Sequence, residues 1–222
     1  MIAPPERSAE RDAALAAMLA HVPSLGWTRT ALRRGLRDLG TDPLDAEILF
    51  PGGPADLVEA WVDLADRRMQ AAVAAADTSE LRLPQRVRLA VALRLAAARP
   101  HREAVRRAVA VLALPGHGRV AARTLARTID SIWHAAGDQS ADFSWYTKRA
   151  ILGAIYTATL VFWLRDAGED DSATLAFLDR RLADHAHFHK AQRRCGKAVS
   201  RWLPGHAEAE RRVANDRRRR PV

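Results

Sequence analysis

The sequence predicts an all-α protein. Alanine, the strongest helix former, supplies much of a hydrophobic fraction of 48%, while aromatic residues make up only 6% of the 222 residues. Residues with branched β-carbons form no long runs, and the chain shows neither period-two alternation nor an Asn-Gly or Asp-Gly hairpin signal. This length and apolar content are sufficient for one large helical domain or two small ones.

The first three predicted helices form a helix-turn-helix unit over residues 8–50. Ser8 and Thr28 can cap the first two helices by accepting hydrogen bonds from backbone N–H groups of the first turn. The third helix follows Asp42, has Pro43 at its first position and ends at the FPGGP segment. The three helices are predicted at about residues 10–21, 29–40 and 43–50.

Six further helices are predicted in a larger bundle over residues 54–190. Helix-breaking residues at Pro100, in the LPGHG segment and at Gly137 separate several of them. Their predicted ranges are about residues 55–75, 78–99, 102–112, 120–136, 142–165 and 172–189. The first of the six has an apolar face formed by Leu57, Trp61, Leu64 and the stem of Arg68.

Positive charge is concentrated in a tail, residues 191–222. The tail holds ten Arg and Lys against three Asp and Glu, so it carries most of the net charge of +9. The rest of the chain is close to neutral. An anionic partner is therefore expected to bind the tail first.

The segment FHKAQRRCGKAVSRWL, residues 188–203, predicts an amphipathic helix. Its apolar and basic residues fall on opposite sides, which suits a helix lying on an anionic membrane surface. Packing of the apolar face on the chain's own domain or on a second subunit is an alternative, and nucleic-acid binding is another. The predicted membrane-binding residues are Phe188, Lys190, Arg194, Lys197, Val199, Arg201, Trp202 and Leu203.

The order of these elements resembles that of the TetR-type transcriptional regulators. That family places a small DNA-binding domain ahead of a ligand-binding domain, and the resemblance implies a homodimer formed by the last two helices of the bundle. A recognition helix needs basic or amide side chains toward DNA, but the third helix offers Asp42, Asp45 and Glu47 and no basic residue. We therefore predict no specific DNA binding, and a TetR-type transcriptional regulator is the alternative function.

A second resemblance is carried by a longer motif. The segment DSIWHAAGDQSADFSWYTKRAILGAIY, residues 130–156, resembles the signature of the COQ-nine family, lipid-binding accessory proteins of ubiquinone biosynthesis. The segments HVPSLGWTRTAL, LFPGGPADLVEAW and VLALPGHG upstream, and FLDRRLADH downstream, resemble the family in the same order. The resemblance implies binding of an isoprenoid quinone precursor and its presentation to the di-iron demethoxyubiquinone hydroxylase.

The residues of this motif also predict a corner between two helices. Gly137 can end one helix in a left-handed conformation, and Asp142 can cap the next. Large amphipathic rings and charges of both signs are thereby brought together. That composition is typical of interface centres, although the aromatic residues could instead only fill the corner. With Ser144 departing from the family pattern, the resemblance implies that the partner-binding residues are Trp133, His134, Asp138, Asp142, Trp145, Tyr146 and Arg149.

The segment AILGAIYTATLVFWL, residues 150–164, carries no charge. A membrane span needs about twenty residues, so the segment predicts a buried central helix instead. Its small residues, Ala154 and Ala158 among them, allow either close helix packing or a cavity. The family resemblance favours a lipid cavity in the domain of residues 54–190. The predicted lipid-binding residues are Leu93, Leu112, Leu152, Ile155 and Tyr156.

No catalytic constellation is found in the sequence. The Glu-x-x-His, His-Glu-x-x-His and Gly-x-Ser-x-Gly motifs and a phosphate-binding glycine loop are missing. His185 and His189 have a metal-capable spacing, but no third ligand is evident, and Cys195 has basic neighbours without a readable His partner. The sequence therefore predicts a protein that is not an enzyme and uses neither a cofactor nor a metal.

The beginning of the chain and its single cysteine bear on location. The start, MIAPPERSAERDAA, has no apolar core, so no secretory signal is predicted, and one cysteine excludes an internal disulfide. We expect a cytoplasmic protein peripherally associated with the inner membrane of a bacterium, or one on the matrix side of a mitochondrion.

Overall fold

The computed structural model describes residues 3–138, 144–168 and 170–184. Within these ranges all regular secondary structure is helical, which confirms the all-α prediction. The chain divides into a compact unit that ends at Leu178 and a second unit that begins at Asp179. The sites described below all lie in the first unit.

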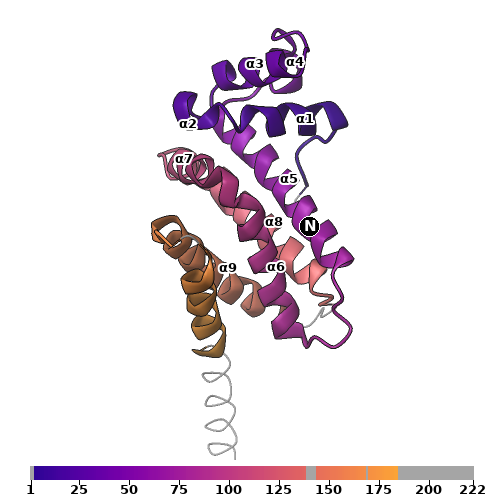
Figure 1. Ribbon diagram of the computed structural model, residues 1–222, viewed down its shortest axis with the longest axis vertical. Helices are drawn as coiled ribbons and strands as arrows, with labels where there is room; N and C mark the ends of the chain where they lie inside the picture. The colour runs from indigo at the N-terminus through magenta and orange to yellow at the C-terminus, as the bar shows by residue number, and fades with distance from the viewer. Residues whose placement is uncertain (1–2, 139–143, 169, 185–222) are drawn as a thin grey trace, which may run out of the picture. The chain divides into compact units, whose positions relative to one another are not determined.

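The first unit contains two groups of helices (Figure 1). The N-terminal group comprises α1 (Ala9–Met18), α2 (Val22–Leu25), α3 (Arg29–Asp38) and α4 (Asp45–Leu49). The larger group comprises α5 (Pro54–Ala75), α6 (Leu83–Ala98), the 3₁₀ turn η1 (Arg99–His101), α7 (Arg102–Leu112), α8 (Gly118–Ala135) and α9 (Ser144–Arg165). A further helical stretch begins at residue 172.

The two predicted caps of the N-terminal group are confirmed. Ser8 accepts a hydrogen bond from the backbone N–H of Arg11, and Thr28 accepts one from that of Ala31. Gly35 permits α1 and α3 to cross closely, because a Cβ atom there would lie only 2.6 Å from the backbone nitrogen of Met18. The predicted helix-turn-helix is thus held by close backbone packing.

Two helix boundaries in this group differ from the prediction. The first helix ends at Met18, and α2 then forms a separate turn that contains Pro23, because proline is tolerated in the first turn of a helix. The third helix begins at Asp45 rather than Pro43. The carboxylate of Asp42 accepts a hydrogen bond from the N–H of Leu44, which holds the preceding residues in a turn.

Helix α5 runs from the N-terminal group into the bundle (Figure 1) and packs against α8 and α6. Leu57, Trp61 and Leu64 are buried on it as predicted. The prediction for Arg68 is wrong, because its side chain is exposed. The opposite side of α5 is buried as well, and it includes three carboxylates, Glu59, Asp63 and Asp66.

Arginine partners make the burial of these carboxylates tolerable. Glu59 accepts hydrogen bonds from Arg123 at 2.7 Å and from Arg127 at 2.6 Å, which join α5 to α8. Asp63 accepts from Arg7 at 2.9 Å and from Arg67 at 3.1 Å. Burial acts to raise the pKa of Glu59, but the two arginines outweigh burial and hold that pKa below its usual range.

A tryptophan pair joins the N-terminal group to the bundle. Trp27 is 2% exposed, its ring centroid lies 5.2 Å from that of Trp61, and its indole Nε1 donates to the carbonyl of Ala104 on α7 at 3.0 Å. Burial of one such ring stabilises the fold by roughly 4–6 kcal/mol before entropy is subtracted. The two groups of helices therefore share one core.

Helix α9 is buried on one face only, which corrects the prediction of a helix buried all round. Leu152, Tyr156 and Trp163 are buried. A second face, carrying mostly small residues, is exposed among the described residues, because the main packing partner of α9, α8, covers only part of its surface. The exposed residues of this face are Ala150, Ala154, Thr157, Ala158 and Val161. None of the described helices is both long and apolar enough to cross a bilayer.

Candidate functional site

The predicted corner begins where α8 ends. Gly137 adopts a φ of 80°, as predicted for a left-handed stop. Its N–H donates to the carbonyl of His134 at 3.0 Å, and the N–H of Asp138 donates to the carbonyl of Trp133 at 3.1 Å. This pair of bonds is the Schellman motif, which satisfies carbonyls that the helix end would leave without partners.

Ion pairs connect the two sides of the corner. The carboxylate of Asp138 is 6% exposed and lies 3.5 Å from the ammonium of Lys148 on α9. The same ammonium lies 5.9 Å from the ring centroid of Trp133, within cation–π range. Arg149 on α9 donates from Nε to Asp130 on α8. Charges on both helices therefore fix the start of α9 beside the end of α8.

Several of the predicted partner-binding residues lie at this surface. Trp133 is half-buried, His134 is exposed, and the side chain of Tyr146 is 75% exposed. Asp142 and the side chain of Trp145 lie outside the described residues. The structure thus brings Trp133, Asp138 and Arg149 into one corner, and their role in partner binding stays a prediction.

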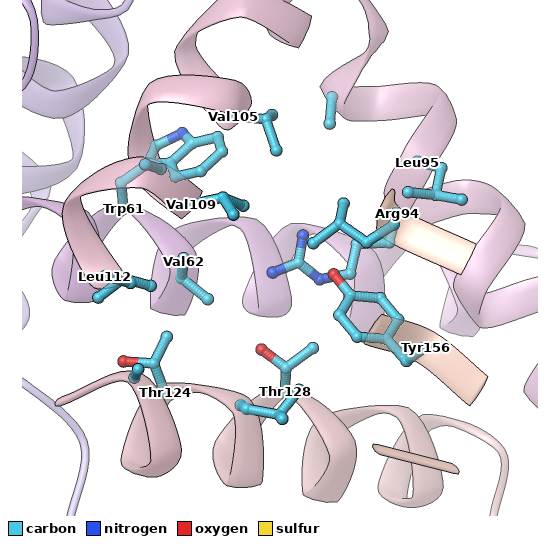
Figure 2. A pocket seen from close by; sticks show the side chains of 15 residues that line it. Trp61, Val62, Arg94, Leu95, Val105, Val109, Leu112, Thr124, Thr128 and Tyr156 are labelled. Carbon is cyan, nitrogen blue, oxygen red and sulfur yellow. The ribbon is translucent and has the colours of Figure 1, made fainter. Parts of the chain in front are cut away.

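A cavity of about 100 Å³ lies among α5, α6, α7, α8 and α9 (Figure 2). Leu112 and Tyr156, two of the five predicted lipid-binding residues, line it. Leu152 and Ile155 are buried without lining it, and Leu93 is half-buried away from it. The other apolar residues that line it are Trp61, Val62, Leu95, Ala98, Val105, Ala108, Val109, Ala121, Leu125 and Leu160.

Ala154 and Ala158, whose small size predicted either close helix packing or a cavity, do not line this cavity. They line an open groove of about 1020 Å³ between α8 and α9, on the other face of α9. Tyr156 and Leu160 are the α9 residues that reach the cavity. Sequence alone did not distinguish the two faces, because small and bulky apolar residues occur on both.

A polar cluster at the cavity was not predicted from the sequence. Arg94 on α6 is buried, and its Nε and Nη2 each lie 2.8 Å from Oδ1 of Asp66 on α5. The hydroxyl of Thr128 on α8 donates to Oδ2 of Asp66 at 2.9 Å. A usable signal existed, since Arg94 is the one charge in the segment LAVALRLAAA and Asp66 falls on the buried face of α5.

Burial controls protonation in this cluster. It raises the pKa of the Asp66 carboxyl against the opposing charge of Arg94. It also raises the pKa of Tyr156, whose ring centroid lies 5.8 Å from the guanidinium carbon of Arg94. The phenol of Tyr156 therefore remains protonated near pH 7 and can donate a hydrogen bond.

Helix α4, the third predicted helix of the helix-turn-helix unit, has an acidic and apolar surface. Its charged residues are Asp45 and Glu47, and Glu47 pairs with Arg33 of α3. Leu44 and Ile48 are exposed, Ile48 by 79%. No basic residue of α4 is available for phosphate contacts, and the absence of specific DNA binding stays a prediction.

Comparison with known proteins decides the family. The COQ9 family model matches residues 119–189, which span the corner. The chain is 33% identical over 203 residues to the ubiquinone biosynthesis protein COQ9, mitochondrial, of Rattus norvegicus, covering 87% of this chain and 65% of the relative. The Xenopus laevis protein COQ9-B is 32% identical, with 87% of this chain and 69% of the relative covered. The chain belongs to the COQ9 family.

The COQ9 relatives are longer than this chain. The human COQ9 protein is 33% identical over 87% of the chain, and the match covers 64% of the human protein. The names of the three relatives place them in ubiquinone biosynthesis and in mitochondria. The chain spans about two thirds of their length, including every helix that forms the corner and the cavity.

The solved structures connect this COQ9 chain to the TetR fold. A TetR transcriptional regulator from Nitrosomonas europaea superposes with a TM-score of 0.65, covering 81% of this chain and 99% of the regulator. The two sequences are 24% identical, so the likeness establishes the fold alone. It confirms the predicted TetR-like architecture.

Proposed function

We propose that the protein is an accessory protein of ubiquinone biosynthesis. It binds an isoprenoid quinone precursor at the membrane and presents it to the di-iron demethoxyubiquinone hydroxylase. The observation that carries the proposal is the COQ9 match, which covers 87% of the chain and includes both the corner and the cavity. This role needs recognition surfaces rather than a reacting group, because the hydroxylase performs the chemistry.

The cavity supports the ligand part of the proposal. Its walls are mainly apolar, and five helices contribute to it. Sites for small organic ligands are typically apolar with a few placed polar groups, and they lie between helices in bundles. A volume of about 100 Å³ accommodates one end of a long lipid, so the remainder lies outside the cavity.

The corner supports the partner part. The half-buried ring of Trp133 lies beside the Asp138–Lys148 ion pair, and the ring of Tyr146 is exposed in the first turns of α9. Interface hot spots are enriched in tryptophan and tyrosine flanked by arginine. The preformed ion pairs hold these side chains in place, so less conformational entropy is lost on docking.

Two further proposals concern assembly and the membrane. The exposed face of α9 and the groove beside it carry small apolar residues, including Gly153, Ala154 and Ala158, which permit close packing against a second copy of the chain. The basic tail, residues 191–222, attaches the dimer to anionic lipid through its charge.

Mass spectrometry of organic extracts tests the ligand part. Protein purified from cells that make ubiquinone should release an isoprenoid quinone precursor in near-stoichiometric amount. The same extraction from an unrelated TetR-fold regulator purified in parallel should not. Recovery of no isoprenoid lipid above that control, from a folded sample, would overturn the proposal.

A further inference from the structure

The two ends of the cavity differ in chemistry (Figure 2). At the deeper end, Arg94, Thr128 and Tyr156 are buried and bring polar atoms together. Leu112, Leu125 and Leu160, which also line the cavity, are apolar and only half-buried. In Figure 2, Leu112 lies beside Thr124 and away from Tyr156, so a ligand that enters beside Leu112 meets Thr124 before it reaches Arg94 and Tyr156.

One polar atom in the wall lacks a partner. Thr124 is 3% exposed, and its Oγ1 makes no hydrogen bond within the described part of the chain. A buried hydroxyl without a partner costs about 1–3 kcal/mol, so a native structure rarely keeps one without a reason. Threonine in a helix samples two χ1 rotamers, and Thr124 lines the cavity one turn from Thr128.

The charge at the deeper end is already balanced. Oδ1 of Asp66 accepts from Nε and Nη2 of Arg94, and Oδ2 of Asp66 accepts from the hydroxyl of Thr128. An anionic ligand would have to compete with Asp66, whereas a neutral oxygen needs only a hydrogen bond from Tyr156 or Thr124. The volume of about 100 Å³ is about two thirds of that of an engineered cavity that holds benzene (about 150 Å³), so a ring bound here fills the cavity and extends toward its half-buried lining residues.

We propose that this cavity binds the neutral, oxygen-bearing ring of the ligand, which enters ring first. Thr124 and Tyr156 hydrogen-bond the ring oxygens, the Arg94–Asp66 pair excludes anions, and the apolar tail leaves between Leu112, Leu125 and Leu160. This inference rests on the proposed function for the identity of the ligand as a quinone precursor.

Binding of single-ring probes to the full chain tests the inference. Phenol, benzene and benzoate are titrated by ligand-detected NMR against the native protein and the Thr124→Val variant. Loss of one hydrogen bond should weaken phenol binding about fivefold in Thr124→Val while benzene binds unchanged or more tightly. Benzoate should bind more weakly than phenol to the native protein.

A matched control is available on α9. Thr159 is also buried, but its hydroxyl already donates to the carbonyl of Ile155 at 2.8 Å and it does not line the cavity. Thr159→Val should leave the preference between phenol and benzene unchanged. Equal phenol affinity in native and Thr124→Val protein, or benzoate binding more tightly than phenol, would overturn the inference.

Lipid extraction separates this inference from the proposed function. If native protein yields an isoprenoid quinone precursor but the phenol affinity is insensitive to Thr124→Val, the ring lies elsewhere and only the inference fails. If the probes behave as expected but no isoprenoid lipid is recovered, the proposed function fails and the cavity serves another neutral ring compound.

Discussion

Two helix junctions of this molecule present surfaces of different composition. The junction between α3 and α4 has the architecture of a DNA reader, yet α4 presents Asp45, Glu47 and the exposed Ile48. The corner between α8 and α9 presents Tyr146 beside an Asp138–Lys148 ion pair. The comparison illustrates that two junctions of one fold can present different chemistry, because each depends on its local side chains.

Loss of the ion pairs between α5, which follows the first junction, and α8, which precedes the corner, should give the largest effect. Glu59→Gln removes the negative charge that joins α5 to Arg123 and Arg127 of α8, leaving both cations without this buried counter-charge. We expect a loss of about 2–4 kcal/mol in the free energy of unfolding at pH 7. Urea denaturation of both proteins measures it, and a loss below about 0.5 kcal/mol would show that the link is dispensable.

The same pair has a defined pH dependence. The folded-state pKa of Glu59 lies below its usual range, so its contribution is present above the pKa of the unfolded state and is lost as the pH falls. The stability difference between native protein and Glu59→Gln should therefore shrink as the pH falls from about 5 to about 3. A difference that stays constant over that interval would contradict the assignment.

Partner binding should separate the two junctions. Tyr146→Lys at the corner should weaken binding of the di-iron hydroxylase at least about thirtyfold, the scale of a hot spot, without loss of stability. Ile48→Lys on α4 is the matched control, because Ile48 is equally exposed, and it should leave binding unchanged. Affinity is measured by surface plasmon resonance, and the reverse pattern would move the docking surface to α4.

Close packing of α1 against α3, the helix that leads into the first junction, can be tested with glycines. Gly35→Ala forces a Cβ against the backbone of Met18 and should cost about 1–3 kcal/mol of stability. Gly153→Ala on α9 meets nothing closer than 3.9 Å and should stabilise the helix by about 0.5–1 kcal/mol. Thermal denaturation compares the two, and a neutral Gly35→Ala would show that α1 and α3 can separate without cost.

DNA binding should show the smallest effect. A chain ending at residue 190 should not shift genomic DNA fragments in a gel at about physiological salt. The full chain should shift them only weakly and without sequence preference, because its basic tail contacts phosphates alone. Sequence-specific binding by the shorter chain would restore the regulator function and remove the contrast between the junctions.

The sequence predicted features that are set by local chemistry. The caps at Ser8 and Thr28, the left-handed Gly137 and the helical class all depend on a few adjacent residues. The burial of Arg68 and the all-round burial of α9 were predicted wrongly, because which face of a helix is buried depends on partners far along the chain. The pairing of Asp66 with Arg94 was not predicted for the same reason, because it depends on the packing of α5 on α6.

The buried indole of Trp27 couples the movements of the two helical groups. Its hydrogen bond to Ala104 reaches α7, whose Val105 lines the cavity. A hinge between the groups would have to break that bond and expose the two indoles of Trp27 and Trp61, which contact each other at an angle of 45°, to water. The N-terminal group therefore moves as one rigid body with α7. A ligand that displaces α7 displaces these helices with it, and the group does not fold as an independent domain.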